Sequence, residues 1–159
     1  MAQSSRASCA FCKVIRGEHQ SPVVWEDAVS LAFLDRRPLF PGHCLLVPKQ
    51  HYETLVELPT PLLAPLFATA KVLARAVEEG LGAEGSFVAI NNRVSQSVPH
   101  LHIHVVPRRR HDGLRGFFWP RHPYQDETEL RQTQQALHVV MARLSKEAEH
   151  ASITKLSHE

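Results

Sequence analysis

Three histidines alternate with apolar residues in the run His100-Leu101-His102-Ile103-His104. Successive side chains of a β-strand point to opposite faces, so this run predicts a strand over 101–106 with one imidazole face and one apolar face packed on a core. Adjacent imidazoles repel one another when protonated, which lowers their pKa values and favours neutral rings. A neutral ring nitrogen is a good nucleophile near pH 7 and a good metal ligand. The run indicates catalysis or metal binding, with a His-rich structural strand as the remaining alternative.

Apolar runs predict four further strands, at residues 23–25, 29–34, 43–47 and 86–90, the first two forming a hairpin. A helix is predicted between them, with Thr60 as its N-cap, Pro61 and Pro65 in its first turn and Gly80 at its end. Its apolar stripe has helical spacing and comprises Leu62, Leu66, Ala70, Leu73 and Val77.

A second helix is predicted near the C-terminus, where Asp126 and Glu129 resemble a capping box. Its apolar stripe comprises Leu130, Leu137, Met141 and Leu144. These elements predict an α+β fold: an antiparallel sheet of about five strands, one central helix and a C-terminal helix. Residues 1–8 are expected to be a disordered leader, residues 9–107 the functional domain, and residues 108–159 a C-terminal extension packed on that domain.

The composition is that of a globular protein, with 159 residues, 43% hydrophobic residues, 21% charged residues and a formal net charge of +2. A charge this small argues against a protein that binds polyanions over its whole surface, so any phosphate contact needs a local cluster of basic residues. Arg108–Arg110 is the candidate, although runs of arginine are usually solvated loop residues. No apolar run approaches the roughly 20 residues of a membrane span, and a cytoplasmic location is the expectation, with no membrane partner.

The wider pattern resembles the histidine triad family, whose signature alternates three histidines with apolar residues. The signature stands here as His100-Leu101-His102-Ile103-His104-Val105-Val106, without departure. The resemblance continues in Cys9–Ile15, Ala32–Asp35, Pro41–His43, Val47–His51 and Gln96–Val98. It is collinear over roughly residues 9–107 and looks closest to the Hint-like and bacterial branch, which carries a Cys-x-x-Cys.

The resemblance implies a hydrolase or transferase that forms a covalent nucleotidyl-histidine intermediate. His102 would attack the α-phosphorus, His104 would donate to an α-phosphate oxygen, and His43 would hold the His102 ring in its working tautomer. Gln96 and Ser97 would bind the phosphate and the atom bridging to the leaving group. The nucleoside would be held by Asp35 at the ribose, by Phe11, Phe33 and Leu34 around the base, and by Asn91 or Asn92 at the ribose or phosphate.

Cys9 and Cys12 alone are compatible with a zinc site, a redox pair or coincidence, although a redox pair would want a βαβ context that is missing. Similar bacterial triad proteins bind a structural zinc through two such cysteines and two histidines, which correspond to His51 and His100 here. The resemblance therefore implies a Cys₂His₂ zinc site that leaves His102 free. No metal is expected to be needed for the chemical step.

The functions that remain open differ in class. The first is an enzyme acting on AMP conjugates, either nucleoside phosphoramidates or dinucleoside polyphosphates, and the resemblance also implies a homodimer. The second is a nucleotide-binding interaction protein with little physiological catalysis, which would have no need of a bare nucleophile. The third is a zinc-dependent nucleic-acid binder, which the modest charge makes the weakest of the three.

Overall fold

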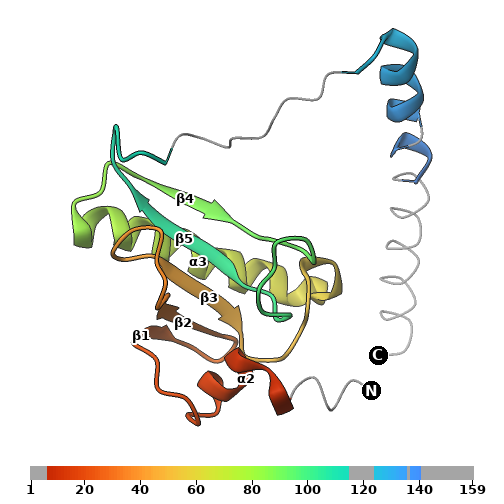
Figure 1. Ribbon diagram of the computed structural model, residues 1–159. Coiled ribbons are helices and arrows are strands. Elements are labelled where there is room, and N and C mark those ends of the chain that lie inside the picture. The colour runs from red at the N-terminus through yellow and green to blue at the C-terminus, as the bar shows by residue number, and fades with distance from the viewer. Residues whose placement is uncertain (1–6, 115–123, 136, 141–159) are drawn as a thin grey trace. The chain divides into compact units, whose positions relative to one another are not determined.

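A computed structural model describes residues 7–114, 124–135 and 137–140 (Figure 1). The chain divides into two compact units, residues 1–115 and 116–159. In the second unit, residues 127–135 and 137–140 are helical, and Glu129 N donates to Asp126 Oδ1 over 2.8 Å as a helix cap requires. The predicted C-terminal helix is therefore present. Met141, Leu144, most of the predicted leader and part of the C-terminal extension lie outside the described residues.

The first unit contains a five-stranded antiparallel sheet with the strand order β1-β2-β3-β5-β4. Figure 1 shows one long helix, α3, lying along this sheet, and a short helix, α2, at the other side of β2 and β3. The element bounds are α2 Ala10–Ile15, β1 Val23–Glu26, β2 Ser30–Leu34, β3 Cys44–Pro48, the 3₁₀ turn η1 Leu55–Glu57, α3 Thr60–Leu81, β4 Gly85–Ala89 and β5 Ile103–Arg108. The α+β fold predicted from the sequence is confirmed.

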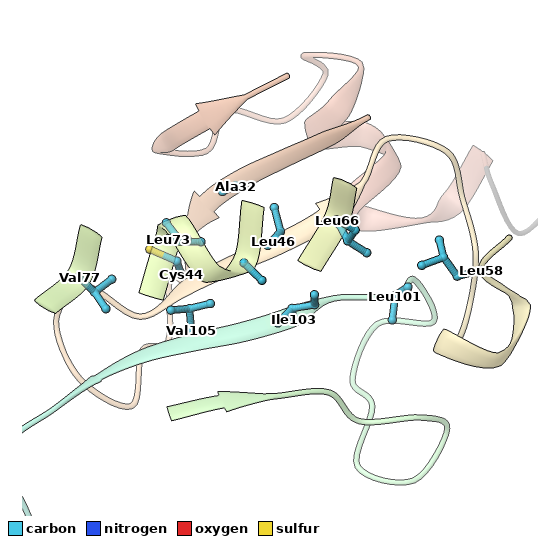
Figure 2. Packing of buried hydrophobic residues seen from close by; sticks show 11 residues of the cluster. Ala32, Cys44, Leu46, Leu58, Leu66, Leu73, Val77, Leu101, Ile103 and Val105 are labelled. Atoms are coloured by element: carbon cyan, nitrogen blue, oxygen red, sulfur yellow. The ribbon is translucent and has the colours of Figure 1, made fainter. Parts of the chain in front are cut away.

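Both faces of the central strands are buried. Alternate residues point to opposite faces, and each face packs against a different cluster of buried residues. On one face the stripe of α3 meets the sheet in the cluster of Figure 2, and Leu101, Ile103 and Val105 all belong to it. On the other face α2 and its N-cap residue pack Phe11, Cys12 and Cys9 against β2 and β3. The sheet is thus a rigid support with a different layer on each side.

Helix α3 differs from the prediction at both ends. It begins at Thr60 with Pro59 as the N-cap, and it ends at Leu81, where Gly82 adopts the left-handed conformation with φ 61°. Gly80, the predicted end, lies inside the helix. Pro65 also lies inside the helix rather than in the first turn. The carbonyl of Pro61, which loses its helical partner at this point, belongs to an exposed residue and can be hydrated.

The described residues contain one helix, Thr60–Leu81, that is long and apolar enough to cross a membrane by length and composition. The expectation that no apolar stretch approaches such a length needs this qualification. The helix packs Leu66, Ala70, Leu73 and Val77 into the core, and a core helix passes the same test. Its apolar character is therefore accounted for by the sheet it covers.

The histidine run differs from the prediction because the regular strand begins only at Ile103. Leu101 N donates to Tyr52 O over 2.6 Å instead of joining the ladder with β3, whose pairing with β5 ends at Leu46 and Ile103. The alternation of faces nevertheless persists through Leu101, which is fully buried in the core under α3. His100 and His102 therefore lie in the irregular segment just before β5, and His104 is the second residue of that strand.

Candidate active site

The three histidines of the run take part in two different clusters. The rings of His102 and His104 lie 4.8 Å apart between centroids. The ring of His100 instead faces His51 at the same centroid distance and approaches the thiols of α2. The histidine run thus contributes His102 and His104 to one site and His100 to a second site beside the cysteines.

The tautomer of His102 is fixed by a backbone carbonyl. Its Nδ1 lies 2.7 Å from His100 O, and since a carbonyl can only accept, Nδ1 carries the proton and Nε2 is bare. Burial lowers the pKa of His102, partly offset by this hydrogen bond and by the charge of Asp35. The ring is therefore held neutral with one free lone pair. The sequence assigned this holding role to His43, and the structure places the acceptor on His100 instead.

His43 pairs with His104. Its Nε2 lies 3.0 Å from His104 Nδ1, and its own Nδ1 accepts a hydrogen bond of 3.2 Å from Leu39 N. A backbone N–H can only donate, so the His43 proton sits on Nε2 and is donated to His104 Nδ1. His104 therefore carries its own proton on Nε2. The two triad rings hold opposite tautomers: His102 presents a bare nitrogen and His104 presents an N–H.

Burial keeps this second pair of imidazoles neutral. It lowers the pKa of His43, partly offset by the charge of Asp35. Burial, together with the charged forms of His102 and His43, lowers the pKa of His104 to about 4. The Asp35 carboxylate lies 3.6 Å from His43 Nδ1, and its other oxygen accepts from Arg37 N over 2.8 Å. Asp35 is thus fixed at the edge of the histidine cluster.

A cleft of about 520 Å³ opens between α2 and β2. Its lining includes the four residues predicted to hold the nucleoside, which are Phe11, Phe33, Leu34 and Asp35. The Phe11 ring contacts Phe33 edge-on at 5.4 Å and His102 at 5.2 Å. His102 is only 3% exposed and does not line the cleft. The apolar wall and the acid are therefore together, and Phe11, which lines the cleft, also contacts the His102 ring.

The polar loop before the triad is held by hydrogen bonds of the Gln96 side chain. Gln96 Oε1 accepts from Arg93 N over 2.7 Å, and Gln96 Nε2 donates to Glu53 O over 2.6 Å. Ser97 is exposed and Asn91 is partly buried. Both polar atoms of the Gln96 side chain are engaged, so the predicted phosphate contact from this residue is left to its backbone. Ser97 keeps an exposed hydroxyl next to it in the chain.

The four predicted metal ligands are brought together by α2, the segment after β3 and the entry to β5. The ligand atoms of Cys9, Cys12, His51 and His100 all lie within 4.8 Å of one another. Each thiol lies 3.5 Å from His100 Nδ1, and Cys12 Sγ lies 3.2 Å from His51 Nδ1. Zinc bonds of about 2.3 Å to sulfur and 2.0–2.1 Å to nitrogen give tetrahedral S···N edges of about 3.5 Å, so the spacing fits that metal.

The second nitrogen of His100 supports a metal site as well. Nε2 donates to Pro48 O over 2.9 Å, which leaves Nδ1 bare and directed at the two thiols. Burial lowers the pKa of His100 to about 4, partly offset by this bond to Pro48. A buried neutral imidazole beside two thiols has the donor set and the tautomer that a tetrahedral metal needs.

The arginines of the basic run Arg108–Arg110 make hydrogen bonds within the first unit. Arg108 makes a bidentate pair with Asp112 at 2.6 and 3.0 Å, Arg109 Nη2 donates to Leu81 O over 2.8 Å, and Arg110 N donates to Glu84 over 2.8 Å. The pair holds the pKa of the Asp112 carboxyl well below its usual range. These contacts favour the structural interpretation of Arg108–Arg110 over a phosphate-binding role.

Sequence reasoning missed two kinds of contributor to the site, which are backbone carbonyls and part of the cleft lining. The carbonyls of His100 and Glu53 leave no trace in a pattern of side chains. Asn92 was one of the two asparagines expected at the ribose or phosphate, and in the structure its Oδ1 accepts from Leu55 N over 2.8 Å. Glu18, His19 and Gln20 line the same cleft as Asp35, and no pattern in the sequence after α2 marks them as part of it.

The fold and this site define a class: an α+β protein whose sheet presents a pair of neutral imidazoles beside a cleft with an apolar wall and an acid. Comparison with known proteins agrees, since the family model described as HIT domain matches residues 16–111. The chain belongs to the HIT-domain family.

Named relatives include two enzymes. The chain is 37% identical over 108 residues to adenylylsulfatase HINT3 of Arabidopsis thaliana, covering 67% of this chain and 55% of that protein. It is 35% identical over 122 residues to adenosine 5'-monophosphoramidase hnt1 of Schizosaccharomyces pombe, covering 76% of this chain and 89% of the relative. The match to the first relative thus spans little more than half of its length.

Solved structures give the same fold. A zinc-bound histidine triad family protein from Mycobacterium smegmatis superposes with a TM-score of 0.66 at 36% identity, covering 82% of this chain and 99% of that one. The histidine triad nucleotide-binding protein from Candida albicans superposes with a TM-score of 0.75 at 30% identity, covering 86% and 99%.

Proposed function

We propose that this protein hydrolyses AMP conjugates at the α-phosphate through a covalent nucleotidyl-His102 intermediate. The observation that carries the proposal is the pair of opposite tautomers. His102 has a bare Nε2 because its Nδ1 donates to His100 O, and His104 next to it has a proton on Nε2 because its Nδ1 accepts from His43. A nucleophile and a hydrogen-bond donor thus stand 4.8 Å apart between ring centroids.

The reaction follows from these two nitrogens. His102 Nε2 forms a bond to the α-phosphorus while the bond to the leaving group breaks, and that group departs with a proton taken from solvent through the hydroxyl of Ser97. His104 Nε2–H donates to an α-phosphate oxygen as negative charge grows there, a contact worth a few kcal/mol in such sites. Water then attacks the phosphorus and loses a proton to solvent while the bond from phosphorus to His102 Nε2 breaks. AMP is released and His102 is free again.

The nucleoside would occupy the cleft. Phe11 and Phe33 offer an apolar wall to a base, and Asp35 offers an acceptor to ribose hydroxyls. The substrate would be a nucleoside phosphoramidate or a dinucleoside polyphosphate, both of which place a leaving group on the α-phosphorus. The relatives named for adenylylsulfatase and for AMP phosphoramidase activity support a leaving group of this kind.

We also infer that Cys9, Cys12, His51 and His100 hold a structural zinc ion. The fit of the four donor atoms and the zinc-bound relative from Mycobacterium smegmatis support this assignment. A closed tetrahedral ion supplies a cross-link between the N-terminal helix and the triad segment. The chemistry at His102 would proceed without a direct role for it.

The test is AMP release from adenosine 5'-phosphoramidate and from diadenosine polyphosphates by the wild-type protein and by His102→Ala. The wild type is expected to turn over at least one substrate, and the variant to lose roughly 10³-fold or more of kcat, as nucleophile variants do. An inactive wild type that still binds AMP would instead favour a nucleotide-binding interaction protein. The more active substrate would identify the leaving group that the site prefers.

A further inference from the structure

The loop of residues 90–99 joins β4 to the first histidine of the run and carries Ser97. Two non-glycine residues in it, Arg93 and Ser95, have φ values of 66° and 60°. Side chains with a Cβ are strained in this left-handed region, and such conformations persist where the surroundings impose them. The loop therefore needs contacts that hold its shape.

Side-chain amides from the loop provide those contacts. Gln96 bonds to Arg93 N inside the loop and to Glu53 O outside it, which sets the curvature of the strained residues. Asn92 is exposed at the surface, yet its Oδ1 accepts from Leu55 N over 2.8 Å. Both amides thus fasten the loop to the segment 53–57, where Arg93 Nη2 also lies 3.9 Å from Glu57 Oε1 at the surface.

The segment 53–57 is itself held in place by burial and by internal hydrogen bonds. Thr54 is 2% exposed, and the Glu57 carboxylate accepts from Glu53 N over 3.1 Å and from Thr54 Oγ1 over 3.3 Å. One residue before it, Tyr52 O accepts from Leu101 N, the residue adjacent to His102 in the chain. The segment 53–57 and its neighbour Tyr52 therefore hold the loop with Ser97 and the backbone next to the nucleophile.

We propose that Asn92 is a positioning residue, which fastens the loop 90–99 to the segment 53–57 and so fixes Ser97 relative to His102. This inference rests on the proposed function. The amide oxygen of Asn92 is used by Leu55 N–H, so we assign the residue a role through the loop rather than a contact with substrate. Its loss would let the loop relax from its strained shape, and a misplaced donor at the leaving group would slow the chemical step.

The experiment compares Asn92→Ala with Asn92→Asp and Val94→Ala. Aspartate keeps an acceptor oxygen for Leu55 N–H, whereas alanine removes it; Val94, which is 80% exposed in the same loop, is the matched control. Each protein is assayed with adenosine 5'-phosphoramidate and with an AMP aryl ester, whose better leaving group needs less help. Hydrogen–deuterium exchange of residues 93–98 reports the order of the loop independently of turnover.

Asn92→Ala is expected to lose roughly ten- to a hundredfold in kcat on the phosphoramidate and less on the aryl ester, with AMP affinity within about threefold of wild type. Its loop should exchange faster, while Asn92→Asp and Val94→Ala stay close to wild type. A fully active Asn92→Ala, an equal loss on both substrates, or an Asn92→Asp as impaired as the alanine variant overturns the inference alone. A wild type without turnover on either substrate overturns the proposed function and this inference with it.

Discussion

At the scale of single residues, the site depends on which nitrogen of each imidazole carries a proton. Burial supplies the neutral state of the rings, and three acceptors or donors supply the tautomers: His100 O for His102, Leu39 N for His43 and His43 for His104. Burial that favours a neutral ring also makes folding depend on pH, because the unfolded chain still binds the proton.

The depressed pKa of His104 predicts a loss of stability in acid. An unfolded imidazole takes up a proton below pH 6.5, whereas folded His104 does so only near pH 4, so the free energy of unfolding falls as pH drops through this window. The shift corresponds to about 2–3 kcal/mol. We expect wild type to lose that much more stability than His104→Gln between pH 7 and pH 4, measured by urea denaturation. Parallel pH profiles for the two proteins would contradict the assignment.

The sequence identified the side chains of the site better than their partners. His43, His102 and His104 gather as the resemblance implied. A period-two pattern places His102 and His104 on one face, and the pairing of β3 with β5 brings His43 next to His104. The predicted hydrogen-bond partner of His102 was wrong, because the actual acceptor is a backbone carbonyl, which no sequence pattern reveals. The engagement of Gln96 by Glu53 O could not be foreseen either, since it joins residues 43 positions apart across two irregular segments.

At the scale of elements, the strands were predictable and their limits less so. Each predicted strand is present, with ends shifted by up to two residues. The largest shift is at β5, where Leu101 N bonds to Tyr52 O and the ladder starts late. Asp27 is a further contact that no periodicity reveals: it accepts from Val29 N and Ser30 N at 2.8 and 2.7 Å and closes the hairpin.

The end of α3 gives a paired test of the helix terminus. Gly82 has φ 61° and its N–H bonds to Glu78 O as a C-cap, so Gly82→Ala should destabilise the fold by about 1 kcal/mol. Gly80 lies within the helix with no atom within 4 Å of an added Cβ, so Gly80→Ala should stabilise it by about 0.5–1 kcal/mol. Chemical denaturation of both variants measures these opposite signs, and a helix ending at Gly80 would reverse them.

At the scale of the whole molecule, the metal cluster links distant parts of the chain. Cys12 and His100 are separated by 88 positions, and α2 otherwise rests on the sheet through a small cluster around Phe11 and Phe33. A cross-link over such a long loop restricts the unfolded chain strongly. The first unit should therefore depend on the metal for stability more than for chemistry.

Cys12→Ser is expected to lower bound zinc from about one ion per chain to nearly none and to lower Tm by more than about 5 °C. Cys44→Ala is the matched control, because Cys44 lies in the core under α3 and not in the metal cluster. Elemental analysis and thermal unfolding of the two variants provide the readouts. Full zinc content in Cys12→Ser would contradict the assigned ligand set.

The homodimer implied by the family resemblance is also testable on the whole chain. Light scattering after size exclusion should give twice the chain mass of 17.9 kDa, unchanged over a tenfold dilution. A mass equal to one chain at all concentrations would contradict the expected dimer.

The most direct test of the central claim is to trap the intermediate on His102. Wild-type protein mixed with an AMP conjugate labelled in the α-phosphate is quenched in alkali within its first turnovers, since an N-phosphoryl histidine is labile in acid, and the digest is mapped by mass spectrometry. The account predicts a labelled adenylyl group on the peptide that contains His102, and none in His102→Ala. Rapid turnover with no labelled histidine, or label on another residue, would contradict it.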